Sequence, residues 1–159
     1  MKLEIKRKIY RFFVFKFLKY YYDCYYVIGE KKRLHIGTRS AVANTLFNVA
    51  SGTITIGNRT IMGQNVMIIT GRHQFENGKR ISLNPMFDDG SWGGNEEVPK
   101  FGFDIKIGDG VFIGSGAIIL GPCEIGDHSI IAAGSVVNKD FPHHSFIAGV
   151  PAELKRKTF

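Results

Sequence analysis

Aliphatic residues recur at every sixth position through much of this chain, and this period decides which folds are open to it. In the second half the series is unbroken, and its members are Ile107, Ile113, Ile119, Ile125, Ile131 and Val137. A spacing of six fits neither the 3.6-residue period of an α-helix nor the simple alternation of a strand. It predicts a short strand followed by a turn, repeated, with one aliphatic side chain per unit directed into a common core.

The same pattern is present, less regularly, in the first half of the chain. It passes through Ile36, Val42, Ile56, Met62 and Ile68. A small residue, most often Gly, follows the aliphatic residue, and Gly, Asn and Asp tolerate the bent backbone of a tight turn. Stacked turns of this kind build a β-solenoid whose coils lie about 4.8 Å apart. An ordinary sandwich of short strands would show irregular spacing instead.

The period stops after Ile68 and resumes only at Ile107, and this interval is not a whole number of units. The intervening segment, taken as residues 71–104, is rich in Gly and polar residues, with scattered aromatic residues. Long loops within a compact domain usually have a function. This loop begins beside His73, which directly follows the last regular strand, so we expect His73 to belong to a functional site.

Composition limits the alternatives. The chain has 159 residues, which suits one domain, and a net charge of +7. The basic residues cluster at the two ends and form no nucleic-acid recognition motif, so we expect no nucleic-acid partner. Two cysteines, Cys24 and Cys123, are too few for a disulfide scaffold and favour a reducing compartment.

Two stretches near the C-terminus, "AAGSVVNKD" and "AGVPAELKR", are more specific than the period alone. Together with the repeat, they make residues 34 to 157 resemble the hexapeptide-repeat acyltransferases, closest to the maltose, galactoside and polysaccharide O-acetyltransferases. The resemblance implies an all-β fold, a left-handed parallel β-helix, with one long extruded loop. It divides the chain into a basic and aromatic segment at 1–33 that we expect to be helical, the β-helix at 34–150 and a basic tail at 151–159.

The resemblance also implies an active site. His73 would be the catalytic base that takes a proton from the acceptor hydroxyl, since imidazole has a suitable pKa. Acetyl-CoA would be the acyl donor, and no metal is required. Ser115 and Ala133 would contact its pantetheine arm through backbone groups, and Lys139 and Arg156 would approach its phosphates. The family often has a second base near Glu153, for which Lys155 or Lys157 would compensate.

Two further residues are candidates for binding the acceptor. Asn44 resembles an asparagine that positions the acceptor or the reacting carbonyl, although a turn asparagine fits equally well. Trp92, in the loop, would stack on a sugar ring or hold the loop against the prism. No two of the five histidines are five residues apart, which argues against the three-histidine zinc site of a related carbonic anhydrase fold.

The function implied is a coenzyme A-dependent O-acetyltransferase acting on a saccharide, in surface polysaccharide or glycolipid biosynthesis. We expect a homotrimer with active sites between subunits, because one subunit alone would expose an apolar side. The alternatives are an N-acyltransferase acting on an amino sugar and a non-catalytic trimeric scaffold. An N-acyltransferase for nucleotide-linked sugars would often carry an N-terminal nucleotide-binding subdomain, which residues 1–33 are too short to form.

Residues 1–33 are not explained by the resemblance. Basic residues alternate there with Phe and Tyr, and the longest early apolar run, 12–15, is too short to span a membrane. The apolar residues would surround a helix rather than form one stripe. Two interpretations therefore stay open: a helix packed on its own protein or on a neighbouring subunit, and a peripheral anchor on an anionic membrane. Both fit a cytoplasmic protein, in the second case at the inner membrane face.

Overall fold

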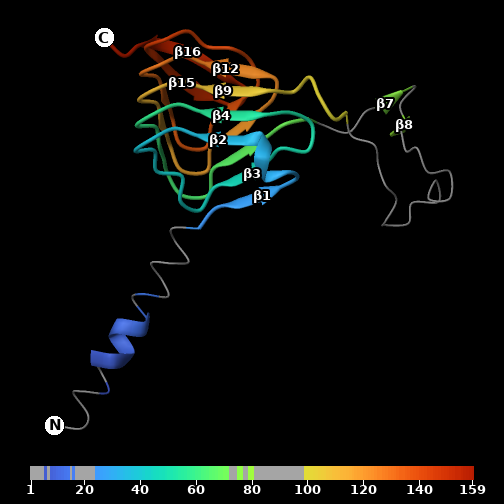
Figure 1. The fold of residues 1–159 in the computed structure, drawn as a ribbon. Coiled ribbons are helices and arrows are strands. Elements are labelled where there is room, and N and C mark those ends of the chain that lie inside the picture. The colour runs from blue at the N-terminus through green and yellow to red at the C-terminus, as the bar shows by residue number, and fades with distance from the viewer. Residues whose placement is uncertain are drawn as a thin grey trace, which may run out of the picture.

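The structure of the protein is a computed structural model that describes residues 6, 8–14, 16, 24–71, 75–76, 79–80 and 99–159 (Figure 1). The described residues between 6 and 16 are helical. Among the residues described, no helix combines the length and the apolar character needed to cross a bilayer. Almost all of the rest is short strands and turns, as the six-residue period predicts.

Three sheets form the sides of a prism. Sheet A contains, in spatial order, β1 (Tyr26–Ile28), β3 (Leu46–Asn48), β6 (Met67–Ile69), β11 (Ile118–Leu120) and β14 (Val136–Val137). Sheet B contains β12 (Cys123–Ile125), β9 (Ile105–Ile107), β4 (Ile54–Ile56) and β2 (Leu34–Ile36). Sheet C contains β16 (Ala152–Lys157), β15 (Ser145–Gly149), β13 (Ile130–Ile131), β10 (Phe112–Ile113) and β5 (Ile61–Met62). The 3₁₀ turn η1 (Lys31–Arg33) precedes β2.

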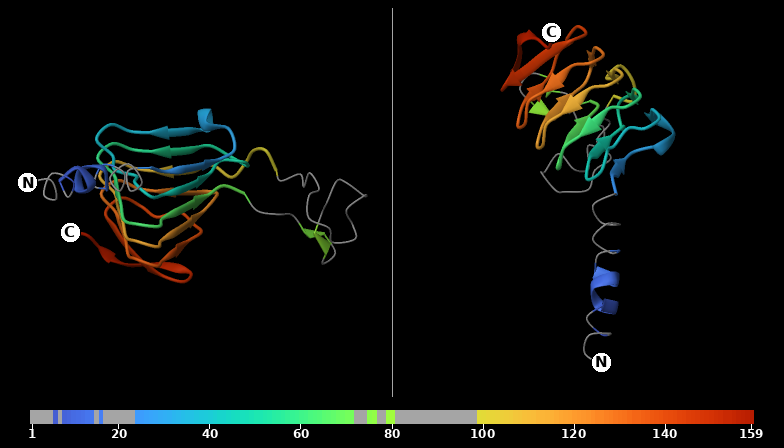
Figure 2. Two further views of the ribbon diagram at one scale, coloured as in Figure 1. Left: turned by 90° about the horizontal axis from the view of Figure 1, so that it is seen from below. Right: turned by 90° about the vertical axis from the view of Figure 1, so that its left-hand side faces the viewer.

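Strands of successive coils pair in parallel, so the chain is a parallel β-helix. In the second half, Ile107 pairs with Ile125, Ile113 with Ile131 and Ile119 with Val137. Each of these partners is three members further along the regular series, so three units of the period make one coil. The coils stack in chain order from blue to red along one axis (Figure 2).

The first coils are longer, which explains their less regular period. Ile36 pairs with Ile56, and Phe47 pairs with Ile68, so each of these coils takes slightly more than three units of the period. The extra residues bulge at a corner and leave the inward positions aligned. The extruded loop is accommodated in the same way, since Ile56 pairs with Ile107 and Ile68 with Ile119 across it.

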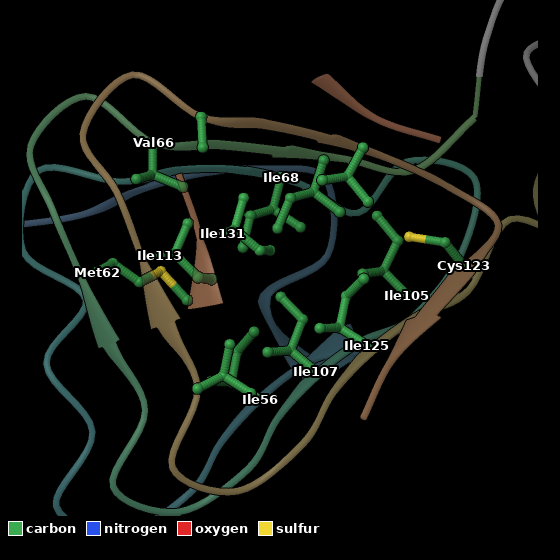
Figure 3. Close-up of a cluster of buried hydrophobic side chains, with 14 of the residues drawn as sticks. Ile56, Met62, Val66, Ile68, Ile105, Ile107, Ile113, Cys123, Ile125 and Ile131 are labelled. Atoms are coloured by element: carbon green, nitrogen blue, oxygen red, sulfur yellow. The ribbon is translucent and has the colours of Figure 1, made fainter. Parts of the chain in front are cut away.

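The predicted aliphatic column is the core. All six residues from Ile107 to Val137 in the regular series are at most 2% exposed. The side chains of Ile107, Ile113, Ile125 and Ile131, with those of Ile56, Met62 and Ile68, point inward from the three sides of the prism (Figure 3). Burial raises the pKa of the Cys123 thiol, which also faces this core, to about 12.

The end of the chain is more ordered than the expected basic tail. After Pro151 the backbone turns back, and β16 pairs antiparallel with β15, placing Phe146 opposite Arg156. Residues 152–157 thus form the edge strand of sheet C, and they close this end of the solenoid.

The inward residue of a coil should determine stability, whereas its outward neighbour should not. We predict that Ile107→Ala lowers the free energy of unfolding by about 2–5 kcal/mol, because it leaves a cavity in the prism. Lys106→Ala, on the exposed face of the same strand, should change it by less than about 0.5 kcal/mol. Chemical denaturation of both variants measures this, and equal effects would contradict the assignment of the column.

Candidate functional site

The prism has three corners, which are named here by the sheets that they join. The B–C corner includes Asn58 and Asp109, the C–A corner includes Gln64 and Ser115, and the A–B corner includes Thr70. At each corner the backbone bends between two strands, and residues from successive coils lie above one another. The predicted site residues therefore have to be assigned to corners.

Ser115 and Ala133 occupy equivalent positions at the C–A corner, in successive coils. The Ser115 carbonyl accepts the Gly134 N–H at 3.0 Å, and the Ser115 Oγ accepts the Gln64 N–H at 3.0 Å. In the second bond a corner side chain accepts the corner N–H of the preceding coil. Both predicted residues are exposed, and the structure brings them together.

Ala133 cannot make the equivalent bond to the coil before it, because a methyl group cannot accept a hydrogen bond. The backbone N–H of Ser115 consequently has no acceptor among the described residues, and neither has that of Ala133. Polar backbone groups are normally paired with protein or water. Two N–H donors of exposed residues, one coil apart, are thus available for the carbonyl oxygens of an extended ligand.

The two predicted basic residues lie near the same end of the solenoid. Lys139 follows β14, with its Nζ 5.7 Å from the centroid of the Phe141 ring. Arg156 is in β16, with its guanidinium 4.8 Å from the centroid of the Phe146 ring. Both side chains are exposed, so they can reach an anionic ligand.

Glu153 is already neutralised by a neighbour. Its carboxylate accepts a hydrogen bond from Lys155 Nζ at 2.8 Å, and this bond lowers the pKa of Glu153 below its ordinary value. Lys157 donates to the carbonyl of His143 at 3.1 Å. Lys155 is therefore engaged by Glu153, and Lys157 by a backbone carbonyl, so whether either lysine compensates for a second base stays a prediction.

Asn44 lies two coils before Ser115 at the C–A corner, in the left-handed conformation with φ of 52°. Its amide donates to the side chains of Gln64 at 3.2 Å and Asn65 at 2.8 Å. Asparagine tolerates this backbone conformation well. The geometry favours a turn residue that orders the corner. It leaves the side-chain oxygen of Asn44 available to contact an acceptor substrate.

His73 and Trp92 lie outside the described residues. The point at which the chain leaves the prism is well defined, because Thr70 is buried and its hydroxyl donates to the Asn48 carbonyl at 2.8 Å. The next residue, Gly71, has φ of 73°, and a Cβ there would overlap Ser51. His73 is attached two residues beyond this fixed point.

The returning chain is held by a residue that the sequence did not single out. Arg33, in η1, donates to the Lys100 carbonyl at 2.8 Å, and its guanidinium lies 5.0 Å from the centroid of the Phe101 ring. Asp104 then accepts the Thr53 N–H at 2.7 Å. Arg33 is part of a basic run, which gives no sequence signal for this contact.

The exit of the loop and the C–A corner lie at opposite ends of the strands of sheet A. From Asn65 to Gly71 the chain crosses the whole sheet, a span of about 20 Å at 3.3 Å per residue. The outer face between them is apolar, with Leu46, Met67, Ile118 and Val136 in register and half-buried. The outer face of sheet B is instead exposed and polar, with His35, Thr55, Lys106 and Glu124 in register.

Comparison with known proteins confirms the predicted resemblance. Residues 104–139 match the family described as bacterial transferase hexapeptide (six repeats). Galactoside O-acetyltransferase of Escherichia coli strain K12 is 33% identical over 124 residues, which cover 78% of this chain and 54% of that protein. The chain spans about half the length of the curated relatives that it matches.

Solved structures give the same result. A galactoside acetyltransferase in complex with coenzyme A has a TM-score of 0.63 and 29% identity, covering 85% of this chain and 60% of that one. A hexapeptide-repeat acetyltransferase from Vibrio cholerae complexed with acetyl-CoA has a TM-score of 0.65 and 27% identity, covering 84% and 64%. These matches confirm the predicted left-handed parallel β-helix.

The missing acceptor of the Ser115 N–H can be tested without any ligand. We predict that Ala133→Ser gives the Ser115 N–H an internal acceptor, as Ser115 does for Gln64, and slows hydrogen exchange of the Ser115 amide about tenfold or more. Ala133→Val adds bulk without an acceptor and should leave this exchange within about threefold of the wild type. Exchange followed by NMR separates the two, and equal slowing in both variants would indicate shielding rather than a new hydrogen bond.

Proposed function

We propose that this chain, which carries the hexapeptide transferase module at residues 104–139, is an acetyl-CoA-dependent O-acetyltransferase acting on a saccharide hydroxyl. The observation that carries the proposal is the pair of unpaired backbone donors at Ser115 and Ala133. The names of the relatives, with coenzyme A or acetyl-CoA bound in two structural neighbours, support it. We extend it to surface polysaccharide or glycolipid biosynthesis, where such acceptors are assembled.

The C–A corner would bind the donor. The N–H groups of Ser115 and Ala133 are suited to the amide carbonyls of the pantetheine arm, because that arm is extended and the donors are one coil apart. Lys139 and Arg156, exposed on the same end of the solenoid, would approach the phosphates. Since Lys155 is paired with Glu153, these two bases carry most of the attraction.

His73 would act on the acceptor. Its imidazole takes the proton of the acceptor hydroxyl, the oxygen attacks the thioester carbonyl carbon, and the carbon–sulfur bond then breaks. The leaving thiolate receives the proton, so the products are the acetyl ester and free coenzyme A. Trp92 and the side-chain oxygen of Asn44 would contact the sugar.

The site would be completed between subunits. His73 follows an exit at the A–B corner, whereas Ser115 and Ala133 are at the C–A corner across sheet A. If the apolar outer face of sheet A surrounds a threefold axis, the C–A corner of one subunit lies beside the A–B corner of the next. A closed ring with a heterologous interface produces three equivalent sites.

The first test concerns the base. His73→Ala should lower turnover about a hundred- to ten-thousandfold while the protein stays folded and binds coenzyme A. Arg156→Ala should mainly raise the Michaelis constant for acetyl-CoA. Both are measured by release of coenzyme A with a panel of sugars, and a His73→Ala variant that keeps more than about a tenth of the rate would refute the assigned role.

The second test concerns the assembly. Ile118→Lys places a charge on the apolar face of sheet A and should convert a trimer, at three times 17.8 kDa, into monomers. Thr55→Lys makes the same kind of change on the polar face of sheet B and should leave the trimer intact. Light scattering gives the masses, and an active wild-type monomer would exclude a shared site.

Chemistry separates the alternatives. Acetyl esters are cleaved by mild base, whereas acetamides are not, so base treatment of the product distinguishes transfer to oxygen from transfer to nitrogen. Failure to bind coenzyme A at millimolar concentration would instead favour a trimeric scaffold.

The N-terminal segment supports a second part of the proposal, peripheral contact with an anionic membrane at its inner, cytoplasmic face. Ile9, Tyr10, Phe12 and Phe13 are 52–71% exposed on a helix that also carries Lys6, Lys8, Arg11 and Lys16. Aromatic residues favour the interface, and each base near an anionic surface contributes about 1 kcal/mol. The competing interpretation is a helix that packs on a neighbouring subunit.

Vesicle sedimentation separates the two interpretations. We predict binding to anionic but not to neutral vesicles, weakened by salt and lost when residues 1–22 are deleted. The deleted protein should remain trimeric and active on a soluble sugar. Loss of the trimer on deletion, without vesicle binding by the full chain, would show that the segment is structural.

A further inference from the structure

The B–C corner carries a groove that the proposed transfer reaction does not use. Its volume is about 830 Å³, and it is lined by two corner residues from each of four successive coils. It lies across sheet C from the corner of Ser115 and Ala133. The residues form two columns that run along the axis of the prism.

The first column is engaged in hydrogen bonds that hold the coils together. The Thr38 N–H donates to Asn58 Oδ1 at 2.9 Å, the Asn58 N–H donates to Asp109 Oδ1 at 2.7 Å, and the Asp109 N–H donates to Asp127 Oδ1 at 2.8 Å. The backbone N–H of Asn58 in this way lowers the pKa of Asp109. The second carboxylate oxygens also have neighbours, since Asp109 Oδ2 accepts a long hydrogen bond from the Asn58 amide at 3.4 Å and Asp127 Oδ2 lies 3.3 Å from His143 Nδ1.

The second column is Arg39, Arg59, Gly110 and His128, all in the left-handed conformation with φ between 55° and 63°. Gly and Asn adopt this conformation most readily, yet two coils in succession have arginine. Both arginine side chains are exposed, and neither makes a hydrogen bond or ion pair with any described residue. Their backbones are joined, since the Arg59 N–H donates to the Thr38 carbonyl at 3.0 Å.

Charge is unevenly distributed along this groove. Thr38 and Asn58, in the two coils with Arg39 and Arg59, are neutral, although the Asp109 carboxylate reaches the Asn58 N–H from the next coil. The next two coils have Asp109 and Asp127, with His128 across the space left by Gly110. One end therefore offers two arginines whose backbones are one coil apart, about 4.8 Å along the axis, and the other end offers carboxylate oxygens.

We propose that this groove binds an acidic sugar unit, with its phosphate or carboxylate between Arg39 and Arg59 and its hydroxyls toward Asp109 and Asp127. Guanidinium groups bind these anions through paired, charge-assisted hydrogen bonds. Carboxylate oxygens accept from hydroxyls and repel a second anion, which orients the ligand. The inference does not depend on acetyl transfer, because binding is measured without an acyl donor.

The test uses NMR titration of the full chain with glucose 6-phosphate, glucuronate, glucose and inorganic phosphate. Both acidic sugars should shift the amide signals of Arg59 and Gly110, and each should bind at least about tenfold more tightly than glucose. Inorganic phosphate should bind more weakly than glucose 6-phosphate, since it cannot use the carboxylate end. Comparison of the two acidic sugars identifies the preferred anion.

Variants supply the control. Arg39→Gln and Arg59→Gln should each weaken binding of the acidic sugars about tenfold, whereas Lys106→Gln, which removes one exposed charge on sheet B, should not. Glucose binding as tightly as the acidic sugars would overturn the proposal. So would unchanged affinity in the arginine variants, shifts confined to Ser115 and Ala133, or no binding of any probe at millimolar concentration.

Discussion

Parallel hydrogen bonding between successive coils is the constraint on which the rest of this structure depends. It holds every coil at strand spacing and keeps the inward aliphatic residues in columns, such as Ile107 beneath Ile125. It also limits what can occupy the corners, where backbones approach closely. A Cβ on Gly57 would lie 2.5 Å from the carbonyl carbon of Gly108, so a larger residue there would force the coils apart.

The corners are repeated positions. Their chemistry depends on whether the corner side chain of one coil accepts the backbone N–H of the coil before it. At the B–C corner the series from Thr38 to Asp127 closes one hydrogen bond after another. At the C–A corner Ser115 accepts the Gln64 N–H but Ala133 cannot accept that of Ser115, which leaves donors of the backbone itself. The available donors thus arise from a small departure within a regular scaffold, and the surrounding coils hold that departure rigid.

Sheet A connects the candidate site with the proposed assembly. The loop leaves at one end of the strands of this sheet and the unpaired donors lie at the other end, about 20 Å away. Its apolar outer face contrasts with the polar face of sheet B, although the same backbone builds both. A trimer around sheet A would bury that face. It would also bring the loop exit of one subunit beside the unpaired donors of the next, so one proposal accounts for the apolar face and for the distance between the two parts of the site.

The sequence by itself determined the repeating fold, the core and the place where a loop leaves it. These follow from a local pattern, since one aliphatic residue in six identifies the inward position and the long interval between Ile68 and Ile107 shows an extrusion. The resemblance named the candidate residues, and of these Ser115, Ala133, Lys139, Arg156 and Asn44 lie in the part of the chain that the structure describes.

Only the tertiary structure decided which residues meet. Coils of unequal length, and the larger offset across the extruded loop, place Arg39 beside Arg59 and Gln64 beside Ser115. The tertiary structure also places β16 against β15 and pairs Lys155 with Glu153, where the sequence indicated a basic tail. The physical reason is that a hydrogen bond between coils depends on how many residues each coil takes to turn, and the six-residue period does not give that number for the longer first coils or across the loop.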